Sequence, residues 1–414
     1  MTKKTIDLDY TTRPVDAAGR KSTLSMFMLM LGFTFFSASM WVGQQLAAGL
    51  DFGGFVWAVI LGGLILAAYT GALGYIGAKT GLSLDLLSHR SFGIKGSYLP
   101  SAMISFTQIG WFGVGLAMFA IPVAKEILGL EVTPDSMPWQ GYLLVAIAGI
   151  LMTSSAYFGI KSLTIVSYIA VPAVAILGTA AMIIAVHRGD LGLIEQFSLG
   201  TKNLGIIAGA GLVVGSFVSG GTATPNFTRF AKSGKVGLIT TIAAFFIGNS
   251  LMFLFGAVSS IYAGGNDIFE VMLNLNLFYL AVLVLGLNIW TTNDNALYTA
   301  GLGLANITGM SKKSMVIVSG LIGTVAAVWL YWNFCDWLNI LNCTLPPVGI
   351  ILIISYFTNR KDFLSAPLKQ VNWWAVAGVI AGAVVANLVH WGFPAINGMA
   401  VAALLYWLGQ VIKK

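Results

Sequence analysis

Three polar side chains share one face of a long apolar segment. Asn288, Thr291 and Thr292 stand at i, i+3 and i+4 in the run GLNIWTTNDNALYTAGLG, so on a helix they point the same way. Two hydroxyls and a backbone carbonyl are hard oxygen ligands that suit a small monovalent cation. The alternative is that the hydroxyls bond back to carbonyls of their own helix. The further polar residues that follow favour the ion site.

Asp294 is the only acidic residue deep in any apolar segment. An ionised, unpaired carboxylate near the bilayer centre costs roughly 2.5–3.5 kcal/mol on insertion scales, so we expect this side chain to face the protein interior. Three roles are open: a proton carrier, a partner of a bound cation, or a cap for a neighbouring helix. Its position one turn beyond the threonine pair favours a structural or gating role.

A second candidate site lies in the segment TQIGWFGVG. Gln108 and Trp111 stand at i and i+3, and Gly110 and Gly113 allow another helix to approach closely. A tryptophan ring can stack on a flat ligand, and a glutamine amide offers both a donor and an acceptor. The alternative is a tryptophan packed in the core, and the sequence alone favours that interpretation among the 12 tryptophans.

Two apolar segments are interrupted by polar residues and glycines. They read MLGFTFFSASMWVGQQ and GLVVGSFVSGGTATPNFTRF. Each glycine in a helix costs about 1 kcal/mol relative to alanine, so neither run favours a continuous helix. Close packing through small residues explains either run equally well when taken alone. They are, however, the first and the sixth apolar segments, and interruptions at corresponding positions of inverted repeats indicate the central site of a transporter.

The composition places these segments in a membrane. Apolar residues make up 57% of the 414 residues and charged residues 9%, against roughly 25% charged in a soluble domain. This excludes a soluble enzyme, a disordered protein and a nucleic-acid-binding protein. We expect twelve membrane-spanning helices joined by short loops, with the last one short for a span. They lie at about 24–46, 55–77, 99–124, 142–159, 163–186, 204–224, 236–262, 278–304, 314–332, 335–357, 372–389 and 397–412.

The basic residues give the orientation. Residues 1–21 are too polar for a signal peptide and are expected to form a cytoplasmic tail. With the tail inside, only Lys125, Arg188 and Lys202 of the 22 lysines and arginines fall outside. This asymmetry follows the positive-inside rule. We therefore expect a multi-pass protein of the bacterial inner membrane with both termini in the cytoplasm.

Other residue classes give little sign of chemistry. Cys335 and Cys343 are eight residues apart, which on a helix is about 12 Å and beyond disulfide reach. His89, His187 and His390 are far apart in sequence, so no metal-ligand cluster is expected. Clustered nucleophiles or bases at the membrane face are also missing from the sequence pattern, which argues against an enzyme. A sensor would need an output domain larger than the tail.

Several long motifs resemble those of the nucleobase–cation symport-1 family, and within it the bacterial members that carry cytosine. The motifs are GFTFFSASMW, YIGAKTGL, TQIGWFGVGLAMFAIPV, VVGSF-x-S-x-GT, LGLNIWTTNDNALY and GLGLANITGMS. The resemblance runs from about residue 20 to 400. It implies an all-α, twelve-helix membrane protein with the five-helix inverted-repeat fold of the sodium-coupled leucine transporter, in which helices 1 and 6 are broken. The single transporter domain is 22–414, with repeats at about 22–187 and 203–358 and two further helices within 372–412.

The resemblance also implies where ligands bind. The flat substrate would be sandwiched between Trp111 and Phe217. Polar contacts would come from Gln108, Ser216, Ser219 and Asn288, with the backbone near Phe36 and Ser37 alongside. Sodium would be held by Gly32, Phe35, Asn288, Thr291 and Thr292.

The function implied by the resemblance is sodium-coupled import of cytosine by alternating access. Sodium is the only small cofactor expected, and neither nucleic acid nor an obligate protein partner is expected. A pocket without charge suits a neutral base. Two alternatives stay open: another nucleobase or pyrimidine as substrate, and proton coupling through Asp294. In one place the chain departs from the family, which reads ADFVRF where this sequence has PNFTRF, with Pro225 and Asn226; we expect an effect on inner gating.

Overall fold

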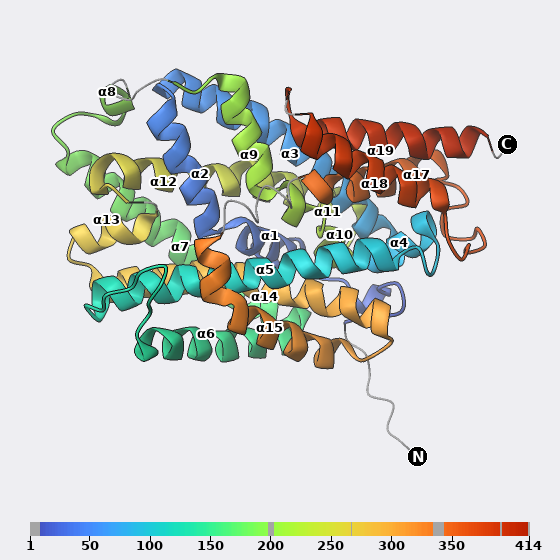
Figure 1. Ribbon diagram of the computed structural model, residues 1–414, viewed down its shortest axis with the longest axis horizontal. Coiled ribbons are helices and arrows are strands. Elements are labelled where there is room, and N and C mark those ends of the chain that lie inside the picture. Colours follow the sequence, from blue (N-terminus) through green and yellow to red (C-terminus); the bar gives the residue numbers. More distant parts are fainter. Residues whose placement is uncertain (1–8, 198–202, 266, 334–342, 390, 413–414) are drawn as a thin grey trace, which may run out of the picture.

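The computed structural model describes residues 9–197, 203–265, 267–333, 343–389 and 391–412. Within these ranges the regular elements are helices, and β structure is limited to two isolated bridges, Lys21 with Ala231 and Thr133 with Ser136. Long helices run side by side along the long axis of the molecule, as α5 and α14 do in Figure 1. The described part of the chain is therefore all-helical, as the apolar segments predict.

Among the described residues, seven helical stretches are long and apolar enough to cross a membrane, or eight if one bent pair counts as a single span. The long uninterrupted helices are α3 (Phe52–Thr80), α5 (Tyr98–Pro122), α6 (Trp139–Phe158), α7 (Ile160–Arg188), α14 (Phe278–Thr308), α15 (Lys312–Trp332) and α19 (Pro394–Val411). Another long stretch joins α11 (Gly234–Ile242) to α12 (Asn249–Ala263) through a π-helical turn. The polar helix α14 is not among the seven.

Three of the expected spans contain helices that are shorter than the predicted segments. They are α9 (Ile206–Gly221), α17 (Pro346–Thr358) and α18 (Trp373–Leu388), all apolar. The predicted tenth segment, 335–357, begins within 334–342, which lies outside the described residues together with Cys335. The described part of this segment reaches helix α17 only at Pro346, where the proline occupies a first-turn position that needs no N–H donor.

The expectation of short loops throughout is wrong. Short helices occupy connections between the long ones: α4 (Leu84–Phe92), α8 (Leu193–Phe197) and α13 (Ile268–Asn274). The Ser83 hydroxyl caps α4 by accepting from Leu86 N, with an acid in its first turn and basic residues in its last, as the helix dipole favours. A search for long apolar runs misses such helices because they are only five to nine residues long.

The first interrupted segment is two helices. They are α1 (Thr23–Thr34) and α2 (Ser37–Gly49), and the chain bends by 57° from the first to the second. Phe35 and Phe36 between them have extended backbone angles. The break leaves the last carbonyls of α1 without partners in a following turn, so they are available to other groups.

The second interrupted segment also ends its helix early. After α9 the backbone turns at residues 222–224, and a single helical turn follows as α10 (Pro225–Thr228). The Asn226 amide oxygen accepts from Leu84 N at 2.8 Å and so holds the start of α4. The departure from the family at Asn226 therefore lies at a contact between α10 and α4.

The packing brings both breaks to the middle of the molecule. Helix α5 packs on α14 and α15, α3 on α9 and α11, and α2 on α12. The pair α18 and α19 lies to one side, drawn in red in Figure 1. Helix α4 and the C-terminal end of α19 lie at one end of the long axis and α13 at the other, so the breaks lie between the two ends.

Candidate functional site

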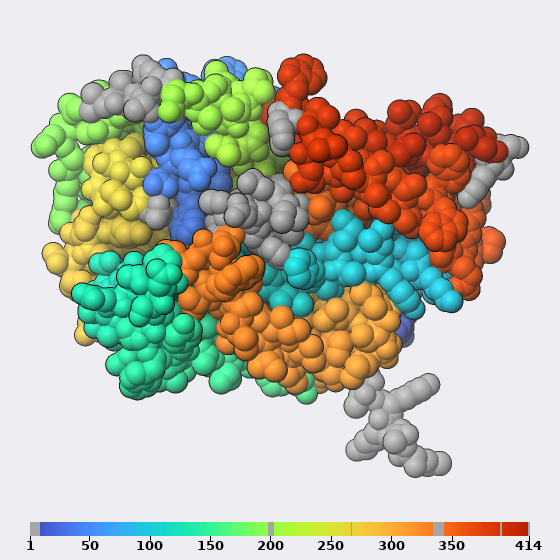
Figure 2. Space-filling model, in the orientation of Figure 1, coloured from blue at the N-terminus to red at the C-terminus, as the bar shows by residue number. Residues whose placement is uncertain are grey.

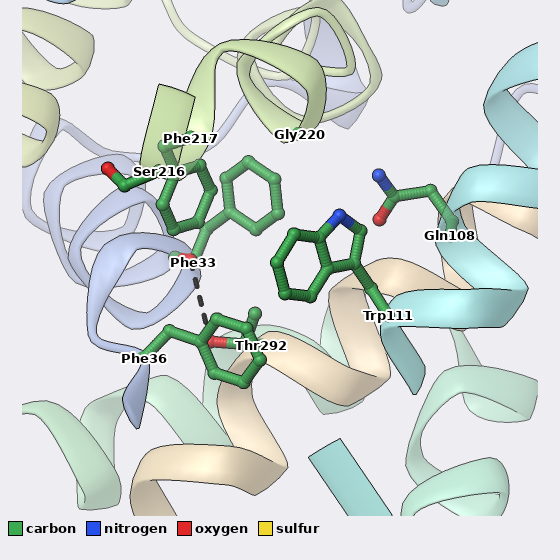
Figure 3. Close-up of a pocket in the computed structure, with 8 residues that line it drawn as sticks. All are labelled: Phe33, Phe36, Gln108, Trp111, Ser216, Phe217, Gly220 and Thr292. Carbon is green, nitrogen blue, oxygen red and sulfur yellow. Dashed lines mark hydrogen bonds between the residues drawn. The ribbon is translucent and has the colours of Figure 1, made fainter. Parts of the chain in front are cut away.

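A small cavity lies between the two breaks (Figure 3). Its lining comes from α1, the α1–α2 break, α5, α9 and α14. The residues are Phe33, Phe36, Gln108, Trp111, Ser216, Phe217, Gly220 and Thr292. The volume is about 10 Å³, roughly that of one water molecule. A planar ring enters only if the aromatic side chains move.

Aromatic rings close this cavity. Phe36 meets Trp111 edge to face, with ring centroids 5.5 Å apart, and Phe33 meets Phe217 in the same way at 5.2 Å. Figure 3 shows these rings turned toward one space. Edge-to-face pairs of this kind contribute about 0.5–1.5 kcal/mol beyond their buried area. The two predicted stacking residues, Trp111 and Phe217, therefore line the same cavity, but other rings fill the space beside them.

Gln108 and Ser216 add polar groups to the lining. The Gln108 Nε2 group is buried without a hydrogen-bond partner, which costs about 1–3 kcal/mol. The Ser216 hydroxyl donates to Val213 O at 2.8 Å and accepts from Asn249 Nδ2 at 3.4 Å. An amide donor is therefore ready to bond a polar ligand, whereas the serine is already engaged.

Three further predicted substrate residues are buried close to the breaks but do not line the cavity. The Ser37 hydroxyl donates to Asn288 Oδ1 at 3.0 Å, which turns the Asn288 amide nitrogen toward Met252 Sδ at 3.6 Å. Ser219 is buried and its hydroxyl has no hydrogen-bond partner. The helix break thus orients Asn288 through Ser37.

Oxygen atoms gather where α1 ends against α14. The Thr292 hydroxyl lies 3.1 Å from the Phe35 carbonyl and 3.5 Å from those of Gly32 and Phe33. A Cβ on Gly32 would stand 2.7 Å from Ser167 Oγ and 3.4 Å from Thr291 Cβ, so glycine keeps this approach close. The donor set is neutral oxygen, which fits a monovalent cation of the sodium type.

The remaining residues of the polar run on α14 have other partners. Thr291 donates to the Leu287 and Asn288 carbonyls of its own helix, at 3.2 and 3.1 Å. Asn293 donates to the Phe112 carbonyl on α5 at 3.0 Å, and Asn295 donates to the Thr291 carbonyl. Asn293 thus joins α14 to α5 and Asn295 bonds within α14, so the presence of these asparagines in the sequence is weak support for an ion site.

Asp294 has no hydrogen bond of acceptable geometry at either carboxyl oxygen, although Ser155 lies near it. It is 1% exposed. The burial of Asp294 agrees with the prediction that its side chain faces the protein interior. Its structural or gating role stays a prediction. No group of three His, Cys, Asp or Glu side chains that could hold a metal ion occurs among the described residues.

The sequence interpretation missed two lining residues, Phe33 and Gly220. Both stand in the last turn before a helix interruption. Phe33 contributes twice, through its ring to the cavity and through its carbonyl to Thr292. Their position in the sequence could have identified them, because residues in the last helical turn before an interruption lie next to the space that the interruption opens.

Comparison with known proteins gives the family. Residues 14–409 match the model of the family described as permease for cytosine/purines, uracil, thiamine, allantoin. The cytosine permease of Escherichia coli (strain K12) is 47% identical over 406 residues, which cover 97% of this chain and 94% of that protein. The chain belongs to this permease family. The resemblance to the nucleobase–cation symport-1 family, predicted from the motifs, is thereby confirmed.

More distant matches cover nearly the whole of this permease. The hydantoin permease of Microbacterium maritypicum is 23% identical, covering 95% of this chain and 87% of the relative. The structure of Mhp1, a nucleobase–cation-symport-1 transporter in a closed conformation with bromovinylhydantoin bound, matches with a TM-score of 0.80 at 18% identity, covering 96% and 94% of the two chains. A sodium-coupled sialic acid symporter matches with a TM-score of 0.74 at 15% identity, covering 99% and 93%.

These matches fix the class of protein. The permease family and its relatives are transporters, so this permease is not an enzyme. The structural matches assign it the fold of Mhp1 and of the sialic acid symporter. The apolar helices agree with a multi-pass membrane protein.

Proposed function

We propose that the protein is a sodium-coupled importer of cytosine that works by alternating access. The observation that carries this proposal is the aromatic cavity between the two helix interruptions, lined by Trp111, Phe217 and the unpartnered amide of Gln108. Such a pocket suits a neutral, planar, hydrogen-bonding ring. Support also comes from the 47% identity to a cytosine permease.

In this proposal the protein spans the bacterial inner membrane twelve times, with both termini in the cytoplasm. The α1–α2 pair and the α9–α10 pair are the broken helices 1 and 6 of two inverted repeats, at about 22–187 and 203–358. Helix α4 and the end of α19 then lie at the cytoplasmic face. The distribution of the basic residues supports this orientation.

Cytosine would stack between Trp111 and Phe217 after Phe33 and Phe36 move aside. Base–aromatic stacking is worth about 1–3 kcal/mol per base. Gln108 and Asn288 would supply amide groups, and Ser216 and Ser219 hydroxyls, beside the backbone at Phe36 and Ser37. An analogue that leaves a buried site group unpaired is rejected, and this is how such a site would distinguish cytosine from uracil.

Sodium would bind among the oxygens of Gly32, Phe35, Asn288, Thr291 and Thr292. The approach of the Thr292 hydroxyl to the carbonyls at the end of α1 supports this assignment. Bound sodium would hold α14 against the α1–α2 break, and Ser37 at the start of α2 would then keep Asn288 in place. By linkage, cytosine must raise the affinity for sodium by the factor by which sodium raises the affinity for cytosine.

The test is uptake into liposomes that contain the purified protein. Labelled cytosine should accumulate under an inward sodium gradient and not when choline replaces sodium; an equal rate in choline would overturn the coupling. Trp111→Ala should abolish binding, whereas Trp57→Ala, at a position 61% exposed on α3, should not. Wild-type affinity in the Trp111 variant would place the site elsewhere.

Two alternatives are decided by simple measurements. The family description includes purines, uracil, thiamine and allantoin, so a competition panel against labelled cytosine measures the substrate range. Proton coupling would need a carrier, and Asp294 is the candidate. Sodium-driven uptake that keeps its pH dependence in Asp294→Asn excludes that route.

A further inference from the structure

A second, larger cavity lies away from the aromatic one, at the end of the molecule that holds α4 and the C-terminal end of α19. Its volume is about 140 Å³. The walls are the end of α4, the connection 359–372 between α17 and α18, and side chains of α17 and α19. Figure 2 shows the C-terminal segments, in red, against the cyan surface of α4 and α5 at this end.

The walls of this cavity are fastened by backbone hydrogen bonds. Ile94 N donates to Lys369 O at 2.9 Å, and Asn372 N donates to Phe92 O at 2.6 Å. Gly93 has a φ of +90°, and a Cβ there would lie 2.7 Å from Gln370 O. The two chain segments therefore approach as closely as glycine permits, and the shape of the cavity is held by the fold.

Two buried polar atoms in the wall have no protein partner. Ser91 is 1% exposed and Asn372 5% exposed, and both line the cavity. The Ser91 hydroxyl and the Asn372 Oδ1 atom make no hydrogen bond, although Asn372 Nδ2 donates to the Ser91 carbonyl at 2.9 Å. Groups of this kind are rare in folded proteins because each costs about 1–3 kcal/mol. They indicate a polar ligand.

The charges of the lining favour an anion. Arg90 and Lys369 provide two cations against one carboxylate, that of Asp362. Arg90 is held in position because one guanidinium nitrogen donates to Ala366 O at 2.8 Å. A guanidinium fixed in this way presents its other N–H groups in a fork that suits phosphate oxygens. The excess of one positive charge matches a phosphate diester.

Exposed apolar side chains on the same connection and at the start of α18 show where such a group would come from. Leu364 is 50% exposed, Leu368 41% and Trp373 72%. Tryptophan is enriched at the level of lipid headgroups, and basic pockets between transmembrane helices on the cytoplasmic side bind anionic headgroups. Acyl chains could cover these side chains while the headgroup enters the cavity.

We propose that this cavity, the α4–α19 cavity, binds the phosphate diester headgroup of an anionic phospholipid from the cytoplasmic leaflet. Arg90 and Lys369 contact the phosphate. Ser91, Asn372 and Asp362 bond the hydroxyls of a headgroup such as phosphoglycerol. The bound lipid joins α4 to the connection before α18. This inference rests on the proposed orientation of the protein in the membrane and not on its substrate.

The experiment is thermal unfolding of the full-length protein in detergent. Phosphatidylglycerol should raise the melting temperature in a saturable manner, because a ligand that binds only the folded state stabilises it by mass action. Phosphatidylcholine and inorganic phosphate, added separately, should not. The double variant Arg90→Gln, Lys369→Gln should need about thirtyfold more phosphatidylglycerol for the same shift, from about tenfold per 1.4 kcal/mol and about 1 kcal/mol for each basic residue.

A matched variant separates the site from general charge attraction. Lys232→Gln, Lys235→Gln removes the same charge from two exposed positions, one just before α11 and one in its first turn, and its response should equal that of the wild type. Equal losses in both double variants would overturn the proposal, as would an equal response to inorganic phosphate. Ser91→Ala should also weaken the lipid response. Cytosine binding is measured on the same variants, so failure of the lipid site and failure of the transport proposal give different results.

Discussion

At the scale of single residues, some polar groups of the site already have hydrogen-bond partners in the protein and others have none. The hydroxyls of Ser216 and Thr291 already bond to protein atoms. Gln108 Nε2 and Ser219 Oγ do not. Because an unpaired buried group destabilises the free protein, the unsatisfied atoms are the ones whose removal should affect binding and stability in opposite directions.

Gln108→Leu tests this at the cavity wall. We expect cytosine affinity to fall at least tenfold, since a lost bond to a buried group is worth about 1–3 kcal/mol. The melting temperature of the ligand-free protein should stay equal or rise. Gln45→Leu, at an exposed position of α2, is the control. Affinity that survives in the Gln108 variant would show that its amide does not meet the ligand.

The two threonines of α14 should differ in their effect on sodium. Thr292 bonds across to the end of α1, whereas Thr291 bonds to its own helix. Thr292→Val should therefore weaken the sodium dependence of cytosine binding by about tenfold or more, which is about 1.4 kcal/mol, and Thr291→Val should weaken it less. A sodium titration of cytosine affinity measures both. The reverse order would contradict the assignment of Thr292 to the ion.

At the scale of elements, the chain before α1 lies over the end of the molecule that holds α4. Asp9 forms a salt bridge of 2.8 Å with Lys312 at the start of α15, and both side chains are largely buried. Arg229, fully buried after α10, donates to the Asp9 and Tyr10 carbonyls and to the Tyr298 hydroxyl of α14. This segment therefore joins one broken helix to α14 and α15.

Lys312→Met should lower stability strongly. Removing one partner of a buried ion pair costs about 3–5 kcal/mol, because it leaves the other charge unpaired. Lys313→Met, at the next residue, should have a small effect, since that ammonium only lies over the Tyr157 ring. Adding Asp9→Leu to Lys312→Met should restore part of the loss. Thermal unfolding of the wild type, the single variants Asp9→Leu and Lys312→Met and the double variant gives the coupling, and purely additive losses would mean that the pair does not interact.

Helix α4 carries a pH-dependent group. Burial raises the pKa of Asp85 above the ordinary value of 3.8, even though Ser101 donates to the carboxylate at 2.6 Å. The folded protein then binds this proton more tightly than the unfolded chain, so stability falls as the pH rises from acid toward the folded-state pKa. Asp85→Asn removes that dependence. The melting temperature of the variant minus that of the wild type should grow from acid to neutral buffers, and a constant difference would contradict it.

At the scale of the whole molecule, the cavity between the breaks is closed. Its volume of about 10 Å³ holds about one water molecule, while the packing of α2 on α12 and of α5 on α14 leaves both breaks between the two ends. In the proposed alternating access, the α1–α2 and α9–α10 pairs open toward one end at a time. Ligands select among such states only by binding one better than another.

This predicts reciprocal stabilisation of the whole protein. Cytosine should raise the melting temperature more in sodium than in choline, and sodium should raise it more when cytosine is present. Both titrations must give the same coupling factor. Thermal unfolding over a grid of the two concentrations measures it. Independent shifts would show that the two sites are not coupled.

The sequence by itself determined the class of protein, the approximate extents of the long helices and the family. A long run of apolar residues indicates directly that a segment lies in lipid rather than in water. The motifs around Gly32, Trp111 and Thr292 are long and contiguous, and they indicate the family. It also marked the residue types of the site, because polar groups at membrane depth are expensive.

Only the tertiary structure decided which of these groups meet. Gln108, Ser216 and Thr292 stand on three helices, and their convergence on one cavity depends on how α5, α9 and α14 pack. Whether a hydroxyl bonds its own helix or a neighbouring one depends on side-chain geometry that spacing does not contain, as Thr291 and Thr292 demonstrate. The α4–α19 cavity combines residues as far apart in the sequence as Arg90 and Gln410, because contacts between distant segments form only when the whole chain folds.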